Sequence, residues 1–170
     1  TGSPFDSFLT LRGLRTLDAR MRVHQENANA IAALLDGHAA VEKVYFPGLA
    51  SHPGHAVAAR QQSGFGAMLS FELAGGENAV RAFVDALRWF TLAESLGGVE
   101  SLVAHPATMT HAAMTPEARA KAGISDGLLR LSVGIEASED LVADLQAALA
   151  RAVQAVAASR GQAQRKPVEA

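Results

Sequence analysis

Apolar residues recur along this chain with helical spacing in some stretches and with strand spacing in others. Near the amino terminus, Ser3 and Pro4 supply an N-cap and a proline for the first helical position, which predicts the start of a long helix. Gly13 is a place where that helix can bend or break, and Gly37 is a suitable stop. A stripe spaced by four and three residues is expected to face the core: Leu17, Met21, His24, Ala28, Ile31 and Leu35.

Two stretches, 68–73 and 128–134, alternate with the period of a strand. In the first, Leu69, Phe71 and Leu73 are expected to point inward, and in the second, Leu129, Leu131 and Val133 are expected to share one face. Arg130 therefore falls on the opposite face of its strand, with Leu128 and Ser132. Shorter apolar runs predict three further strands, at 41–46, 90–93 and 101–104.

Helices are expected between these strands, at 55–62, around 80–87 and at 115–123, and a final one begins at Ser138. The core stripe of the final helix is expected to be Leu141, Leu145, Leu149, Ala152, Val153 and Val156. From Ser159 onward the apolar periodicity stops, so 159–170 are expected to form a disordered basic tail and not an arm that binds nucleic acid. Short strands alternating with helices predict an α/β fold, a small sheet with helices on one face.

Composition narrows the class of protein. The chain has 170 residues, 49% of them apolar, which suits one ordinary domain with a sizeable core. A net charge of −2 gives no reason to expect nucleic acid or an acidic membrane surface as a partner. The absence of cysteine excludes disulfides and thiolate chemistry. No signal peptide or apolar run of about 18 residues is recognised, so a cytoplasmic protein is expected.

Two parts of the sequence suit a binding site better than a core. In the stretch 92–110, Glu94 and Ser95 precede Gly97-Gly98, a pair that lets the backbone approach a ligand closely. Arg130 stands inside an apolar strand and needs an anion, either a ligand or an internal salt-bridge partner. The histidines of Ser51–His55 have no third ligand beside them, so they are interpreted as solvated loop residues and no metal site is predicted.

Several longer motifs carry a resemblance to a known family. These motifs are Glu94-Ser95-Leu96-Gly97-Gly98-Val99-Glu100-Ser101-Leu102, His105-Pro106-Ala107-Thr108-Met109-Thr110-His111, Gly123-Ile124-Ser125-Asp126 and Leu129-Arg130-Leu131-Ser132-Val133-Gly134-Ile135-Glu136. Together they resemble the carboxy-terminal part of the Cys/Met-metabolism enzymes that use pyridoxal phosphate, and within that family the cystathionine γ-synthases and γ-lyases. The similarity covers about Ser3 to Arg151.

The resemblance implies a domain organisation. Residues 1–37 would be the end of the large domain and a long linking helix, whose exposed Phe5 and Phe8 would pack on that domain. Residues 38–158 would be the small carboxy-terminal domain of a fold-type I pyridoxal-phosphate enzyme, a mostly antiparallel sheet covered by helices on one face. The domain that binds most of the cofactor, with the Schiff-base lysine, would lie upstream of Thr1. The chain is thus expected to be part of a longer enzyme, because none of its three lysines (Lys43, Lys121 and Lys166) matches that motif.

The resemblance also assigns roles to four residues. Arg130 would bind the substrate α-carboxylate, and Ser95, the candidate catalytic residue, would lie against that carboxylate and the lysine. Thr110 would line the same pocket, with a buried hydroxyl satisfied by backbone as the alternative. Glu94 would bind the distal amine of cystathionine, which favours γ- over β-chemistry. From the residues alone, turn capping for Ser95 and simple surface exposure for Glu94 remain open.

Two functions follow from these expectations. The first is a transsulfuration enzyme that acts on a small amino-acid substrate, either cleaving cystathionine by γ-elimination or forming it by γ-replacement on an activated homoserine. His105-Pro106-Ala107 is slightly more similar to the lyases. The family implies a homotetramer with pyridoxal 5'-phosphate as cofactor. The alternative is a free-standing domain used for oligomeric association without chemistry.

Overall fold

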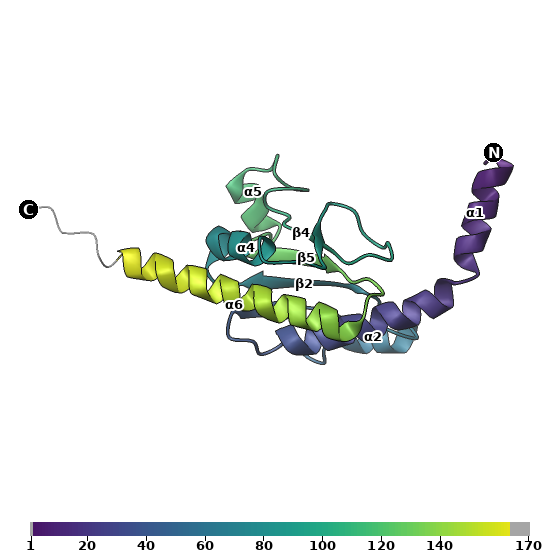
Figure 1. Ribbon diagram of the computed structural model, residues 1–170, viewed down its shortest axis with the longest axis horizontal. Helices are drawn as coiled ribbons and strands as arrows, with labels where there is room; N and C mark the ends of the chain where they lie inside the picture. Colours follow the sequence, from purple (N-terminus) through teal and green to yellow (C-terminus); the bar gives the residue numbers. More distant parts are fainter. Residues whose placement is uncertain (1, 164–170) are drawn as a thin grey trace, which may run out of the picture.

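The computed structural model describes the backbone of residues 2–163 and the side chains of residues 2–159. The elements follow one another as α1 (Pro4–Leu14), α2 (Leu17–Leu35), β1 (Val41–Tyr45), α3 (His55–Gln61), β2 (Met68–Leu73), α4 (Gly76–Val84), β3 (Thr91–Leu92), β4 (Leu102–Ala104), α5 (Pro116–Lys121), β5 (Leu128–Ser132) and α6 (Ser138–Ala163) (Figure 1). Every strand and helix expected from the sequence is present, with ends that differ by a few residues.

The five strands form one mixed sheet in the order β1-β2-β5-β4-β3. Neighbouring strands are antiparallel except at the edge, where β3 and β4 are parallel. The alternation is as predicted, since Leu69, Phe71 and Leu73 of β2 point inward and Leu129, Leu131 and Val133 share one face, and all six side chains are at most 2% exposed. In the register, Leu69 lies opposite Leu131 and Phe71 opposite Leu129, which pairs apolar side chains on the core face.

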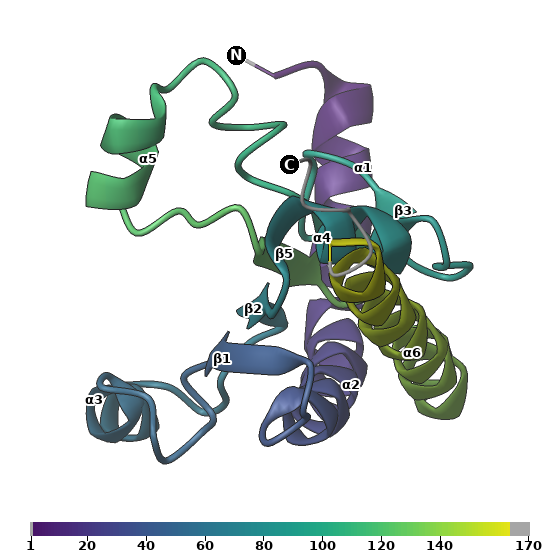
Figure 2. The ribbon, with the colours of Figure 1, turned by 90° about the vertical axis from the view of Figure 1, so that its left-hand side faces the viewer.

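Three helices, α2, α4 and α6, cover one face of this sheet (Figure 2). The core lies between them and the strands, where the rings of Phe71 on β2 and Phe83 on α4 meet edge to face at 5.7 Å. The expected α/β architecture, with helices on one face of a mostly antiparallel sheet, is confirmed. The opposite face of the sheet carries Arg130, and it is approached by loops and by α5, whose Pro116 and Arg119 line a cavity together with Tyr45 and Glu72.

The amino-terminal helix is broken close to Gly13, the residue at which the sequence allowed a bend or a break. α1 ends at Leu14 and α2 begins at Leu17, because the Gly13 carbonyl accepts hydrogen bonds from Thr16 Oγ1 and Arg20 Nη2 in place of continuing the helix. α1 projects away from the sheet (Figure 1), and its Phe5 and Phe8 are 67% and 58% exposed. The exposed aromatic end was therefore predicted correctly.

The break also shortens the predicted core stripe. Leu17 is 40% exposed and Met21 is half-buried, so the buried stripe of α2 begins only at His24. The fully buried part of that stripe contains two residues that the prediction left out, Asn27 and Ala32.

The final helix is longer than predicted and its stripe is slightly different. α6 continues to Ala163, so 159–163 are helical where a disordered tail was expected, while 164–170 lie outside the described residues. Ala148 joins the buried stripe and Val153 is 47% exposed. By length and composition alone, Ser138–Ser159 would be long and apolar enough to cross a membrane, contrary to the expectation that no such run exists. In this structure the stripe packs against α2, α4 and the sheet.

On the outer face of the sheet, Tyr45 of β1 donates a hydrogen bond to Glu72 of β2, which also accepts one from Ser125 at 3.1 Å. The hydrogen bond to Glu72, together with burial and the negative charge of Glu72, raises the pKa of Tyr45 to about 12. Folding therefore favours the protonated phenol. This contribution to stability is complete below the ordinary tyrosine pKa of about 10 and is lost as the pH rises towards the folded-state value.

Tyr45 is the only tyrosine of the chain, so an ultraviolet titration of this chain reports this phenol alone. We expect the folded chain to form tyrosinate with a midpoint well above pH 10 and close to the raised pKa of about 12. Glu72→Gln should bring the midpoint back towards the ordinary value. Equal midpoints for the parent chain and the variant would contradict the assignment.

Candidate functional site

Arg130 lies at the centre of the sheet, on the face opposite the helices. In the register it stands between Ser70 of β2 and Ala104 of β4. Both neighbours are small, so the long guanidinium side chain can pass over them towards the loop that follows β3. The sheet thus places one cation on a rigid strand beside a loop, an arrangement typical of binding sites.

The Arg130 guanidinium is held by backbone and not by a carboxylate. Its Nη2 donates hydrogen bonds to the carbonyl oxygens of Glu94 and Ser95, at 2.9 and 3.0 Å. Its Nε is buried and has no hydrogen-bond partner among the described residues. Within the part of the chain that the structure describes, no carboxylate oxygen lies within 4.0 Å of its nitrogens, so the internal salt bridge left open by the sequence is not formed. The cation is oriented but its charge is not paired.

The structure brings Glu94 and Ser95 to Arg130 through their main chain. Both residues follow β3 and both are exposed. Since their carbonyls, and not their side chains, contact Arg130, the carboxylate of Glu94 and the hydroxyl of Ser95 remain available on the surface beside it. The predicted grouping of these three residues is therefore present.

Thr110 is not joined to this group by any hydrogen bond among the described residues. It lies in the loop between β4 and α5, where its Oγ1 is 2.8 Å from Nδ1 of His111. The residue is exposed, and its partner is a side chain. The alternative of a buried hydroxyl satisfied by backbone is therefore wrong for Thr110.

The loop from Glu94 to Ser101 is attached to the segment that follows Arg130. Gly97 has φ 76°, a left-handed conformation that glycine adopts without strain, and its N–H donates to Ser132 Oγ at 2.8 Å. The Val99 carbonyl accepts from the N–H of Ile135 at 2.9 Å. Gly98 has no such backbone requirement, so only the first glycine of the pair is needed for its conformation.

Sequence reasoning missed the polar residues that make these attachments. They are His24, Asn27, Ser101, Ser132 and Glu136, of which all but Glu136 are at most 4% exposed. Two of them could have been found from the sequence. His24 is a polar residue in an apolar helix stripe, and Ser132 is on the same face of its strand as Arg130. Nothing in the sequence shows that Glu136 contacts Ser101, because 35 residues separate them.

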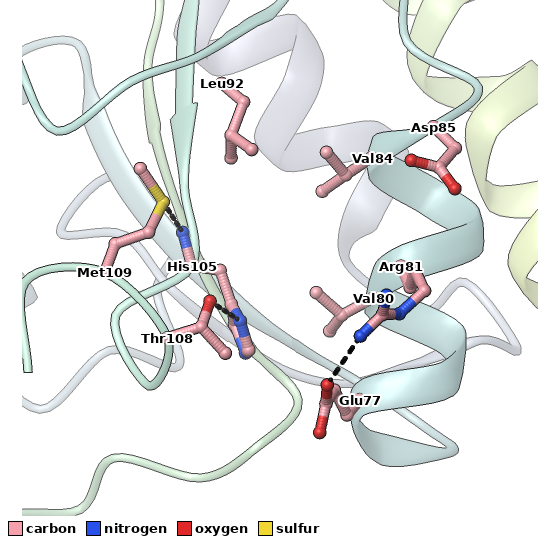
Figure 3. Close-up of a pocket in the computed structure, with 9 residues that line it drawn as sticks. All are labelled: Glu77, Val80, Arg81, Val84, Asp85, Leu92, His105, Thr108 and Met109. Atoms are coloured by element: carbon pink, nitrogen blue, oxygen red, sulfur yellow. Dashed lines mark hydrogen bonds and ion pairs between the residues drawn. The ribbon is translucent and has the colours of Figure 1, made fainter. Parts of the chain in front are cut away.

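A separate cavity of about 190 Å³ lies between α4 and the turn that follows β4 (Figure 3). Its lining consists of Glu77, Val80, Arg81, Val84, Asp85, Leu92, His105, Thr108 and Met109, and none of the four predicted site residues is among them. His105 is buried, its Nε2 donates to the Asp126 carbonyl at 3.1 Å, and its Nδ1 accepts from the Thr108 hydroxyl at 2.8 Å. Because both ring nitrogens are engaged, His105 links two loops in this structure.

Among the described residues, no histidine or lysine is hydrogen-bonded to Arg130. His52 accepts from the N–H of Gly54, and His55 stacks on Phe65 at 5.3 Å. Among the described residues no group of three potential metal ligands is present. Lys43, on edge strand β1, lies over the Tyr45 ring at 4.6 Å, and Lys121 is exposed at the end of α5. Lys166 is outside the described residues.

Comparison with known proteins identifies the family. Residues 1–150 match the model of the Cys/Met metabolism PLP-dependent enzymes. The chain belongs to this family, as the sequence motifs suggested, and the cofactor of the family is pyridoxal phosphate. The fold agrees, because the chain superposes on solved members of the family.

Three relatives show how close the similarity is. The solved cystathionine gamma synthase of Xanthomonas oryzae pv. oryzae is 81% identical, with a TM-score of 0.86 over 91% of this chain and 40% of that one. The cystathionine gamma-synthase of Escherichia coli (strain K12) is 62% identical over 86% of this chain and 38% of its own length. A Lactococcus lactis cystathionine beta-lyase is 58% identical over the same share of each. The chain thus spans about 40% of these relatives, and their names differ in the reaction.

Proposed function

We propose that this chain is the carboxy-terminal, substrate-binding part of a pyridoxal-phosphate enzyme that forms cystathionine by γ-replacement on an activated homoserine. The observation that carries the proposal is the guanidinium of Arg130, which two carbonyls orient at the centre of the sheet and which no carboxylate among the described residues pairs. The choice of γ-replacement is supported by 81% identity to a cystathionine gamma synthase that was solved in complex with cystathionine. That identity outweighs the slight similarity of His105-Pro106-Ala107 to the lyases.

The proposed ligand of Arg130 is the α-carboxylate of the amino-acid substrate. A guanidinium presents donors in a planar fork that matches the two oxygens of a carboxylate. Nη2 of Arg130 already donates to two loop carbonyls, so the side chain is oriented before substrate binds and Nη1 is the nitrogen free to donate to a carboxylate. A contact through two nitrogens would require one of these carbonyls to give up its hydrogen bond from Nη2. An incoming carboxylate would supply the negative charge that the described residues do not provide.

The other predicted residues receive roles around this contact. The exposed carboxylate of Glu94 would bind the distal amine of the cysteine-derived end of cystathionine, which suits γ-chemistry. The hydroxyl of Ser95 would lie against the reacting end of the substrate as a catalytic group. Thr110 would line the same pocket with its exposed hydroxyl, which is 2.8 Å from Nδ1 of the neighbouring His111.

Pyridoxal phosphate, when bound, withdraws electrons from the substrate carbon next to the amine. The residues described here suit the substrate carboxylate, but they place no lysine beside Arg130. We therefore expect the lysine and most of the cofactor contacts upstream of Thr1 in a longer, homotetrameric and cytoplasmic enzyme. The contribution of this chain is to orient the substrate.

The test uses the full-length, cofactor-loaded enzyme that contains this chain. We expect it to convert an activated homoserine such as O-succinylhomoserine, together with cysteine, to cystathionine faster than it cleaves cystathionine. Faster release of cysteine from cystathionine would assign γ-elimination, and homocysteine as the thiol product would assign β-elimination. Activity with none of these substrates would favour the non-catalytic alternative.

A further inference from the structure

We propose that Glu136 is a positioning residue, which sets the loop 94–101 so that Arg130 can bind a substrate carboxylate. The inference rests on the proposed function of Arg130. Glu136 follows β5 by four residues and contacts no part of the proposed substrate site directly. It acts through Ser101 at the far end of the loop.

The carboxylate of Glu136 takes two hydrogen bonds from one residue. Its Oε1 accepts from the backbone N–H of Ser101 at 2.7 Å, and its Oε2 accepts from the Ser101 hydroxyl at 2.8 Å. The same hydroxyl accepts from the N–H of Gly134 at 2.8 Å. Ser101 is completely buried, so water cannot replace Glu136 as the acceptor for its N–H and its hydroxyl. An ionised acceptor makes both bonds stronger than neutral ones would be.

Glu136 is itself fixed to the long helix beneath the sheet. Asn27 of α2 donates its side-chain amide to the carbonyl oxygens of Gly134 and Glu136, at 3.1 and 2.8 Å. His24, one turn earlier, lies with Nδ1 2.6 Å from the Val133 carbonyl. Both side chains are at most 4% exposed. The segment that carries Glu136 is therefore anchored on α2 and cannot follow a moving loop.

The loop 94–101 packs closely against the backbone at Gly134. A side chain at Gly134 would place its Cβ 2.5 Å from the Val99 carbonyl oxygen, closer than atoms can pack. The loop and the strand end are thus in direct backbone contact. Because the backbone at Gly134 blocks movement in one direction, a small displacement of Ser101 shifts the other residues of the loop 94–101.

The other end of the loop contacts Arg130. There the carbonyls of Glu94 and Ser95 accept from its Nη2, and the N–H of Gly97 donates to Ser132 Oγ. The loop is thus pinned at both ends to one strand and its extension. Without the Glu136 contacts, Ser101 keeps the hydrogen bond from the N–H of Thr91 to its carbonyl, at 3.0 Å, but its own N–H and hydroxyl lose their acceptor. The loop can then shift at this end, and the two carbonyls and the guanidinium that they orient shift with it.

The test compares Glu136→Gln with Glu139→Gln in the full-length enzyme. The first variant keeps the shape of Glu136 but replaces one acceptor oxygen by a donor, while the second removes the same charge from an exposed residue in the first turn of α6. We expect Glu136→Gln to raise KM about tenfold with a smaller change in kcat, because even small misplacement of a positioned group is costly. Glu139→Gln should leave KM unchanged. Ser101→Ala gives a second route if Glu136→Gln does not fold.

A binding measurement adds a readout that does not depend on turnover. Calorimetry with L-norleucine and with its amide measures how much the carboxylate contributes to affinity. We expect the ratio of the affinity for L-norleucine to the affinity for its amide to fall in Glu136→Gln and to be unchanged in Glu139→Gln. An unchanged ratio together with an unchanged KM would overturn the role of Glu136.

Combining variants separates this inference from the proposal for Arg130. If Glu136 acts through Arg130, Glu136→Gln should have little further effect on KM in an Arg130→Ala background. Fully multiplicative effects would show that Glu136 has only a structural role. If Arg130→Ala alone leaves KM unchanged, the proposed function fails, whatever Glu136 does.

Discussion

Replacing Arg130 by alanine is expected to raise the KM for the amino-acid substrate about 100-fold in the full-length enzyme, with a smaller effect on kcat. The reason is that Arg130 is an oriented cation whose hydrogen-bond partners, among the residues that the structure describes, are two neutral carbonyls. Removing it takes away a charge-assisted contact with the substrate carboxylate. Steady-state kinetics at several substrate concentrations measures the effect directly.

Two variants control this experiment. Arg130→Lys keeps the positive charge and loses the fork, so KM should lie between those of the parent enzyme and Arg130→Ala. Arg81→Ala removes an arginine whose side chain is 72% exposed and whose ion-pair partner among the described residues is Glu77 on its own helix, so KM should not change. A normal KM for Arg130→Ala would show that the substrate carboxylate binds elsewhere.

Replacing Asp144 by alanine is expected to lower the free energy of unfolding by about 3 kcal/mol. Asp144 lies on α6 and is 6% exposed. Its carboxylate accepts from three consecutive backbone N–H groups, those of Arg88, Trp89 and Phe90, at 2.9, 2.9 and 3.3 Å. Without it, these donors in the turn before β3 lose their acceptor.

Urea unfolding followed by fluorescence measures this loss, because Trp89 is the only tryptophan of the chain and lies in the affected turn. Asp140→Ala is the matched control, since it removes an exposed carboxylate from the first turn of the same helix. We expect less than about 1 kcal/mol for that change. Equal losses for the two variants would show that the three hydrogen bonds of Asp144 contribute little.

Local patterns were sufficient for most of the fold. Strict alternation predicted both faces of β2 and β5, and the Ser-Pro and Thr-Pro pairs predicted the starts of α1 and α5, where Ser3 and Thr115 cap the first turn. These features depend on neighbours within a few residues. Gly13 indicated a possible break in the first helix, but the exact place of that break, at Arg15–Thr16, also involves Arg20, whose side chain donates to the Gly13 carbonyl.

The site was predicted only as far as single residues signal a role. Arg130 was recognisable as a charged residue in an apolar strand, and Glu94 with Ser95 by their place before glycines. That the contacts to Arg130 would come from backbone carbonyls was not predictable. Nor was the network around Glu136, since Asn27 and Gly134 are 107 residues apart in the chain.

The place of β5 in the middle of the sheet has a consequence for how the protein is made. β5 pairs with β2 on one side and with β4 on the other, and neither of these pairs with the other. During synthesis, β2 and β4 therefore leave the ribosome before β5, the strand that pairs with both of them. Until β5 follows, each of the two has one edge whose backbone groups lack their partner strand. Unpaired strand edges invite association with other chains. β5, the strand that carries Arg130, is thus also the strand that joins the two halves of the sheet.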